Sequence, residues 1–73
     1  MDTIDETLIK MVVQHSSIKE MATMVGRSNG GVKLRLTALI KEGYILGPPK
    51  PGMARSYQIT AKGIEYMHNQ GYL

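Results

Sequence analysis

Polar and basic side chains recur between Arg27 and Lys41, at a spacing that could place them on one exposed face of a helix. Asn29 can form paired hydrogen bonds with the edge of an adenine, and Lys33 can donate to guanine or to a phosphate. Thr37 can contact the methyl group of a thymine or donate to a phosphate. The chemistry that these side chains favour is therefore noncovalent binding to a nucleic acid.

Apolar and glycine residues share this segment, and each has two interpretations. Leu34 would be explained by contact with a thymine methyl group, or it is an isolated surface leucine, which is common in proteins. Gly30 and Gly31 could let a helix start approach a sugar-phosphate backbone, with free N–H groups facing phosphate, or the helix begins later, near Val32. The candidate base-reading residues are Ser28, Asn29, Gly30, Gly31, Lys33, Leu34 and Thr37. The candidate phosphate-contacting residues are Arg27, Arg35, Lys41, Lys50 and Arg55.

Catalytic and metal chemistry find no support in the residue spacing. We find no nucleophile–base pair, no paired carboxylates on one helical face and no phosphate-cradling glycine motif. Cysteine is absent, which excludes disulfides and thiolate metal sites. His15 is interpreted either as a pH switch or ligand, or as an exposed imidazole at a helix end; His68 belongs to a different helix. We therefore expect no enzyme, no cofactor and no metal.

Two short helices must position the candidate residues. Ser17 and Glu20 have the spacing of a capping box for a helix over 18–25, and Gly26 follows where a helix end favours a positive φ. Ser28 can cap a second helix over about 29–42, which Gly43 ends. The expected buried stripes of these two helices are Ile18, Met21, Ala22 and Val25, then Val32, Leu36, Leu39 and Ile40.

The flanking segments predict two more helices and a hairpin. A helix over about 4–14 would start with a capping box from Thr3 and Glu6, and a last helix over about 61–69 would be capped by Thr60. Between them, a hairpin over about 44–59 surrounds a loop rich in proline and glycine. The inward residues of the last helix are expected to be Ile64, Tyr66 and Met67.

The order of residue types over about 25 positions, taken together, is specific for a fold. Its members are Met21, Ala22, Val25, Gly26, Ser28, Val32, Leu36, Leu39, Gly43, Tyr44 and Ile45. This order resembles the winged helix-turn-helix family of DNA-binding proteins. The segment 57–63 is similar to the tyrosine-apolar-threonine-x-x-glycine run that follows the wing in the multiple-antibiotic-resistance-regulator-like branch. Arg27 and the Gly30-Gly31 pair depart from the family pattern.

The resemblance implies one α+β, mainly α domain over 1–73, with a three-helix core, a β-hairpin wing and a C-terminal helix. It implies sequence-specific binding to double-stranded DNA by a transcription regulator. The 29–42 helix would lie in the major groove, and the 47–55 wing would lie on the backbone or in the minor groove. Lys50 and Arg55 would be the cations of the wing; the alternative is an ordinary loop with chance charges.

The charge distribution points the same way. Residues 1–25 carry a net charge of −2, residues 26–62 carry +6 and residues 63–73 carry −1. A basic region that includes the predicted 29–42 helix favours a polyanionic partner, although a solvated basic surface is the alternative.

Three further expectations concern partners and location. The alternative function is a winged-helix protein–protein interaction module, an adaptor that does not bind DNA. A homodimer would use the first and last helices through Tyr66, Tyr72 and Leu73, unless these residues only close the core. We expect no signal or transmembrane segment and a cytoplasmic, nucleoid-associated location.

Overall fold

The computed structural model describes residues 1–47 and 57–72 of the 73-residue chain. Within those residues the chain forms an α+β, mainly helical domain with four helices and one two-stranded antiparallel sheet, as expected. The elements are α1 (Thr3–Val13), α2 (Ile18–Val25), α3 (Asn29–Lys41), β1 (Ile45–Leu46), β2 (Gln58–Ile59) and α4 (Ala61–Asn69). In the part of the chain described, no helix is long and apolar enough to cross a membrane.

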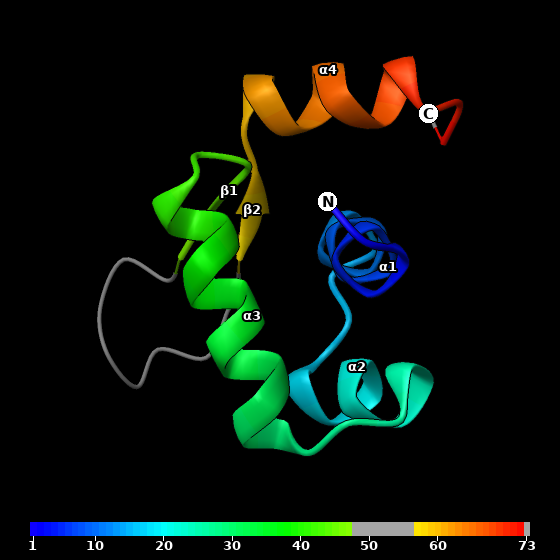
Figure 1. The fold of residues 1–73 in the computed structure, drawn as a ribbon, viewed down its shortest axis with the longest axis vertical. Coiled ribbons are helices and arrows are strands. Elements are labelled where there is room, and N and C mark those ends of the chain that lie inside the picture. Colours follow the sequence, from blue (N-terminus) through cyan, green and yellow to red (C-terminus); the bar gives the residue numbers. More distant parts are fainter. Residues whose placement is uncertain (48–56, 73) are drawn as a thin grey trace.

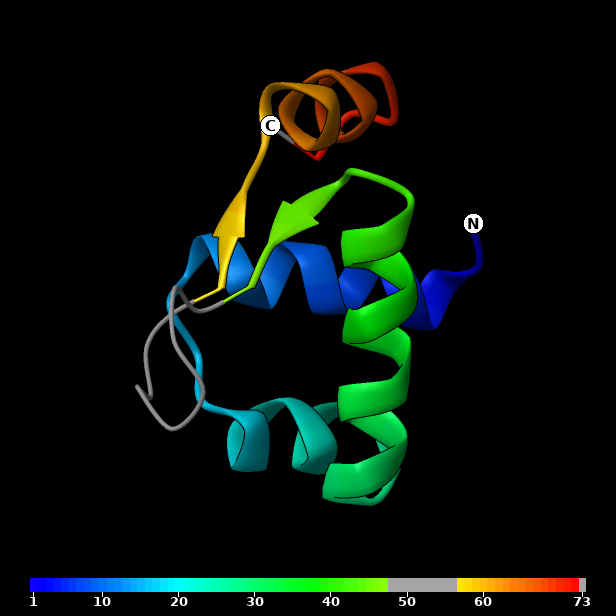
Figure 2. The ribbon, with the colours of Figure 1, turned by 90° about the vertical axis from the view of Figure 1, so that its left-hand side faces the viewer.

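Helix α1 lies at the centre of the domain, between α2 on one side and α4 on the other (Figure 1). Helix α3 runs alongside and contacts α1, α2 and β1 (Figures 1 and 2). The hairpin follows α3, and β2 contacts both α1 and α4. Among the described residues, α3 is therefore held mainly by α1, α2 and β1.

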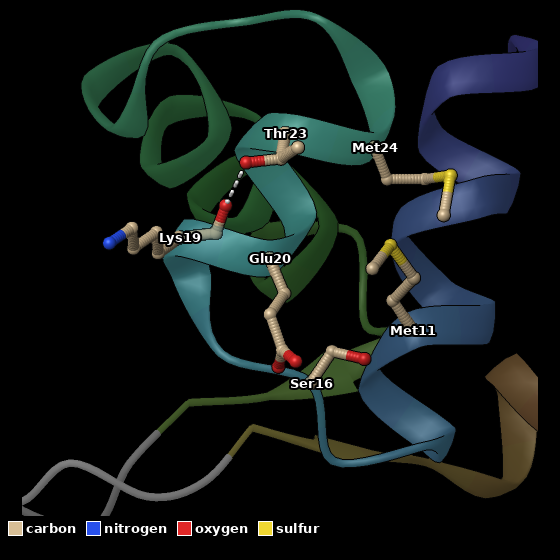
Figure 3. A pocket seen from close by; sticks show the side chains of 6 residues that line it. All are labelled: Met11, Ser16, Lys19, Glu20, Thr23 and Met24. Atoms are coloured by element: carbon tan, nitrogen blue, oxygen red, sulfur yellow. Dashed lines mark hydrogen bonds between the residues drawn. The ribbon is translucent and has the colours of Figure 1, made fainter.

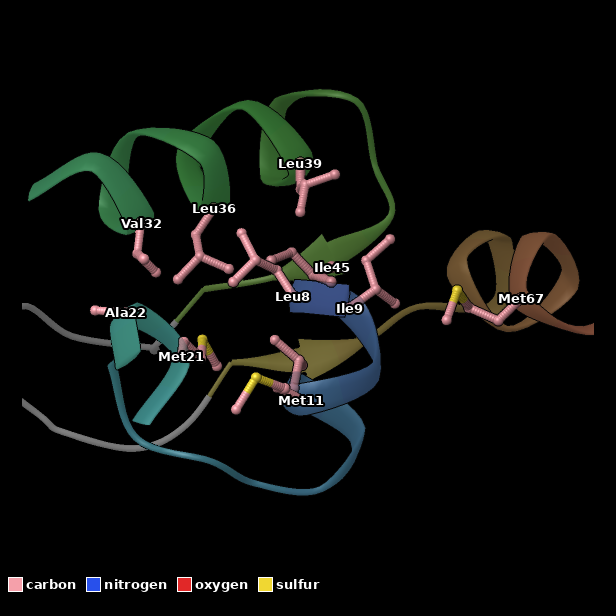
Figure 4. Packing of buried hydrophobic residues seen from close by; sticks show 11 residues of the cluster. Leu8, Ile9, Met11, Met21, Ala22, Val32, Leu36, Leu39, Ile45 and Met67 are labelled. Atoms are coloured by element: carbon pink, nitrogen blue, oxygen red, sulfur yellow. The ribbon is translucent and has the colours of Figure 1, made fainter. Parts of the chain in front are cut away.

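The core is built from apolar side chains of all four helices and of β1 (Figure 4). Its buried members are Leu8, Ile9, Met11, Val12, Met21, Ala22, Val32, Leu36, Leu39, Ile45 and Met67. The stripes predicted for the second and third helices are confirmed, because their members are buried or pack against this cluster. Ile64 was expected to face inward, and this prediction is wrong, since 48% of its surface is exposed. Gly63 and Met67 occupy the inner side of α4 instead.

Most helix ends follow the predicted chemistry. Ser17 and Glu20 form a complete capping box on α2, and Gly26 ends that helix in the left-handed region with φ 69°. Ser28 and Thr60 cap α3 and α4 through their hydroxyl oxygens. Helix α3 begins at Asn29, so both glycines lie within its first turn and the later start near Val32 is excluded.

The start of α1 differs from the prediction. Asp2, not Thr3, is the N-cap, and its carboxylate accepts a hydrogen bond of 2.8 Å from the Asp5 backbone N–H. Aspartate is at least as good an N-cap as threonine, so the helix starts one residue earlier than expected. The Glu6 carboxylate, which was expected to complete a capping box, instead accepts hydrogen bonds from tyrosines near the other end of the chain.

The hairpin is confirmed in the part that the structure describes. Strands β1 and β2 pair antiparallel, with Ile45 opposite Ile59 and Leu46 opposite Gln58. The loop with its three prolines, and with Lys50 and Arg55, lies outside the described residues.

The start of α4 is joined tightly to the end of α3. The Thr60 hydroxyl lies 2.6 Å from the Gly43 carbonyl oxygen and 3.0 Å from that of Tyr44. A Cβ at Gly63 would overlap the Tyr44 carbonyl oxygen and the Ile59 side chain. Only glycine therefore allows this close approach of α4 to the chain that leaves α3. We call residues 42–44 and 60–63 the α3–α4 joint.

Candidate nucleic-acid interface

The side of α3 that faces away from the core is open to solvent. Its exposed residues, called here the outer face of α3, are Gly30, Lys33, Leu34, Thr37, Ala38 and Lys41, and Asn29 is exposed in the first turn of the helix. Val32, Leu36 and Leu39 anchor the opposite side of the helix in the core. Figure 2 shows α3 (green) crossing in front of α1 (blue). The buried stripe thus fixes which side chains α3 presents outward.

The first turn of α3 presents backbone donors. The Ser28 hydroxyl oxygen accepts the Gly31 N–H at 3.0 Å, and the Ser28 carbonyl accepts the Val32 N–H at 3.0 Å. The N–H groups of Asn29 and Gly30 precede the first intrahelical hydrogen bond, and no acceptor for them occurs among the described residues. These two donors lie at the positive end of the helix dipole, which favours an anionic partner.

Among the described residues, no neighbour requires glycine at position 30. A Cβ at this position would meet only the Ser28 hydroxyl oxygen, at 4.0 Å, and the residue is exposed. At Gly31, by contrast, a Cβ would lie 3.3 Å from the same oxygen, so this glycine relieves crowding around the N-cap. Because glycine within a helix costs about 1 kcal/mol relative to alanine, Gly30 is an unexplained cost for the isolated domain.

The charge on the outer face of α3 has one sign. Lys33 and Lys41 are exposed, and the sequence contains no aspartate or glutamate between Glu20 and Glu42. Arg27 is exposed in the turn that precedes α3. Since no carboxylate lies along this stretch to neutralise them, these cations give α3 a field that attracts anions.

Arg35 does not join this group. Its guanidinium lies 3.0 Å from the Asp2 carboxylate and 3.3 Å from that of Asp5, so it faces α1. The hydrogen bond from the Asp5 backbone N–H, followed by that from Arg35, lowers the pKa of Asp2. Hydrogen bonds to both carboxylates raise the pKa of Arg35. The structure therefore gives Arg35 a role in joining α3 to α1.

Lys62 is also engaged within the chain. Its ammonium donates to the Glu42 carbonyl oxygen at 2.7 Å and lies 4.6 Å from the centre of the Tyr44 ring. A cation at the last carbonyls of a helix is favoured by the helix dipole. Lys62 thus stabilises the end of α3, a role that its place in the basic region of the sequence did not reveal.

The tyrosines of the expected dimer patch contact α1 of the same chain. The hydroxyls of Tyr66 and Tyr72 donate to the two carboxylate oxygens of Glu6. The hydrogen bond to Glu6 is the main cause that raises the pKa of Tyr66 to about 12, and the same contact raises the pKa of Tyr72. Leu73 lies outside the described residues. These bonds were not foreseen, because 60 residues separate Tyr66 from Glu6.

A groove of about 540 Å³ lies between α1 and α2, away from α3 (Figure 3). Its lining residues are Met11, Ser16, Lys19, Glu20, Thr23 and Met24. The Glu20 carboxylate accepts the Ser17 N–H at 2.8 Å, and the Thr23 hydroxyl donates to the Lys19 carbonyl oxygen at 3.0 Å. With these polar groups engaged, the groove is mainly an apolar surface.

Within residues 1–47 and 57–72, no group of three or more His, Asp or Glu side chains is placed so that it could hold a metal ion.

Comparison with known proteins found no matching family model, no matching curated protein and no matching solved structure. The geometry and charge of α3 therefore carry the functional inference.

Proposed function

We propose that this chain is a winged helix-turn-helix domain that binds double-stranded DNA in a sequence-specific manner and regulates transcription. The observation that carries the proposal is the outer face of α3, which is exposed along its length and bears Lys33 and Lys41 without any carboxylate. A helix of 13 residues is about 20 Å long, and the major groove, about 12 Å wide, admits such a helix. The hairpin follows α3 in the chain, which is the order of elements in a winged domain, and in this proposal its loop contacts the backbone or the minor groove.

Each candidate residue has a role in the proposal. Asn29 and Lys33 hydrogen-bond to base edges, because both are exposed on the first two turns of α3. Arg27 and Lys41 contact phosphates, together with Lys50 and Arg55 of the wing, and these contacts supply most of the affinity. Arg35 is left out of this set because Asp2 and Asp5 hold its guanidinium.

Gly30 adds independent support. The part of the chain that the structure describes shows no contact that offsets its cost in helix stability, since a side chain there would meet only the Ser28 hydroxyl oxygen. A phosphate or sugar that approaches the backbone at this point would supply the missing reason. The free N–H groups of Asn29 and Gly30 would then donate to phosphate.

A protein–protein adaptor is the second candidate function. The observation that favours it is the exposure of large apolar side chains, 74% for Leu34 and 67% for Met24. A protein partner would bury such residues, and the interface would depend only weakly on salt.

The first test is a salt titration of binding to a mixed-sequence duplex, run beside selection from a random DNA pool. We expect a steep fall in affinity with salt and an enriched motif. Replacing Lys41 with alanine should reduce the magnitude of the log–log salt slope by about 0.9, because one phosphate contact, and the counterions released by it, would be lost. Replacing Lys33 should change the slope less, because Lys33 contacts a base in this proposal; an equal reduction would make Lys33 a phosphate contact instead.

Lys10→Ala is the matched control, because Lys10 is an exposed lysine on α1 and the substitution changes the net charge equally. It should leave the salt slope almost unchanged. If Lys10→Ala changed the salt slope equally, DNA would bind to a diffuse basic surface and not specifically to α3. Absence of binding at low salt would contradict DNA binding and favour the adaptor function. A two-fold symmetric motif would support a homodimer through α1 and α4, with half-sites about one helical turn apart.

A further inference from the structure

Leu34 lies at the centre of the outer face of α3, opposite the buried stripe. The exposed residues one turn before and after it, Gly30 and Ala38, are small. Its side chain therefore projects beyond its neighbours along the helix, and 74% of its surface is exposed. An isolated leucine on a surface needs no explanation, but this one stands between two lysines on a face without carboxylates.

Thr37 lies beside Leu34 on the outer face of α3 and adds a methyl group to its apolar surface. Its hydroxyl donates to the Lys33 carbonyl oxygen at 2.9 Å, within α3. Because this proton is already used, the side chain offers a partner its methyl group and an acceptor oxygen, and no donor. Residues three apart are neighbours on a helix surface, so Leu34 and Thr37 together present an apolar surface to the partner.

The base edges of the major groove differ in what they offer such a surface. Thymine alone carries a methyl group there, whereas guanine is read by arginine or lysine and cytosine by a carboxylate. The outer face of α3 contains no arginine and no carboxylate, and Leu34 and Thr37 offer the guanine acceptors no hydrogen-bond donor. Arg35, the one arginine of α3, is held at α1 by Asp2 and Asp5.

We infer that Leu34 and Thr37 read the C5-methyl groups of thymines in the major groove, so that preferred sites carry T·A pairs opposite the middle of α3. This inference rests on the proposed function, because it requires α3 to lie in the major groove. It adds the base chemistry that the site selects and the two residues that select it.

The test replaces each thymine of the selected duplex, one at a time, with deoxyuridine, which removes only the C5-methyl group. At one or two positions the wild-type affinity should fall about four-fold, the loss expected for one buried methyl group. The Leu34→Ala variant should bind the parent duplex more weakly and lose less than two-fold on the same replacement, as the pairwise contact then no longer exists.

Two Thr37 variants separate methyl from hydroxyl. Thr37→Val keeps the methyl and should bind as tightly as the wild type, whereas Thr37→Ser keeps the hydroxyl and should lose the deoxyuridine effect at one position. Tight, salt-dependent binding that no deoxyuridine replacement weakens would overturn this inference and leave the proposed function standing. A deoxyuridine effect of equal size in Leu34→Ala and in both Thr37 variants would also overturn it, since another residue would then read the methyl. Failure to bind any duplex would overturn the proposed function itself.

Discussion

At the scale of single residues, the most informative position is a glycine whose side chain would meet almost nothing. Gly30 lies in the first turn of α3, is exposed, and would bring a Cβ no closer than 4.0 Å to a neighbouring side chain. Gly63 is the opposite case, because a Cβ there would overlap the Tyr44 carbonyl oxygen. The same substitution at these two positions should therefore change stability in opposite directions.

Gly30→Ala should stabilise the domain and weaken DNA binding. The alanine lowers the backbone entropy of the unfolded chain and should raise the free energy of unfolding by about 0.5–1 kcal/mol. In a domain of this size that corresponds to an increase in Tm of roughly 2–8 °C. Affinity should fall because a methyl group would stand between the helix backbone and the phosphate. Thermal unfolding and a DNA titration of the same preparation test both signs, and unchanged affinity would remove Gly30 from the interface.

At the scale of the helices, much of the fold could be predicted because its signals are local. Ser17 with Glu20, Ser28, Thr60 and Gly26 each determine a helix end through neighbours within a few residues, and the structure has these caps. The error at the start of α1 arose because Asp2 and Thr3 both suit an N-cap, and the sequence alone does not rank adjacent caps.

The missed interactions in the candidate site are long-range. The Arg35 pairs with Asp2 and Asp5 join residues 33 and 30 positions apart, so no helical periodicity could reveal them. Periodicity also predicted that Ile64 is buried, because periodicity depends only on which residues are apolar. It could not show that α4 comes closest to Tyr44 at Gly63, which leaves Ile64 exposed. The residues of the outer face of α3 could be predicted, because they lie opposite the apolar residues that the sequence places in the core.

The close packing at the α3–α4 joint should make Gly63 intolerant of a side chain. Gly63→Ala should lower the free energy of unfolding by about 1–3 kcal/mol, the usual cost of overpacking a filled site, because α4 must move away from Tyr44. Chemical denaturation measures this loss, with Gly30→Ala as the control for the same substitution in another helix. If Gly63→Ala were as stable as the wild type, α4 would not be packed as closely as described.

At the scale of the whole molecule, Glu6 connects the two ends of the described chain. Its carboxylate accepts from Tyr66 on α4 and from Tyr72 beyond it, so α1 and the C-terminal residues are joined through one side chain. The Tyr66 ring also packs edge-on against Tyr44, with ring centres 5.5 Å apart. The charge of the domain is correspondingly divided, with carboxylates engaged around α1 and lysines exposed along α3.

This arrangement predicts a loss of stability in alkali. The pKa of Tyr66 is raised from 10.0 to about 12 in the folded chain, so its contribution to stability is complete below pH 10 and is lost as the pH rises from 10 to 12. The free energy of unfolding, measured by denaturant titration from pH 8 to 12, should fall over this range. Tyr66→Phe should be less stable at pH 8 and should show a smaller fall between pH 10 and 12. An identical fall in both proteins would assign the alkaline transition to other groups, such as the lysines.

The α3–α4 joint has a mechanical consequence. The Gly43 and Tyr44 carbonyls lie within hydrogen-bond reach of Thr60, and Lys62 donates to the Glu42 carbonyl, so side chains of α4 contact three consecutive residues at the end of α3. A force applied to the start of α4 is therefore transmitted directly to the C-terminal end of α3, without an intervening flexible segment.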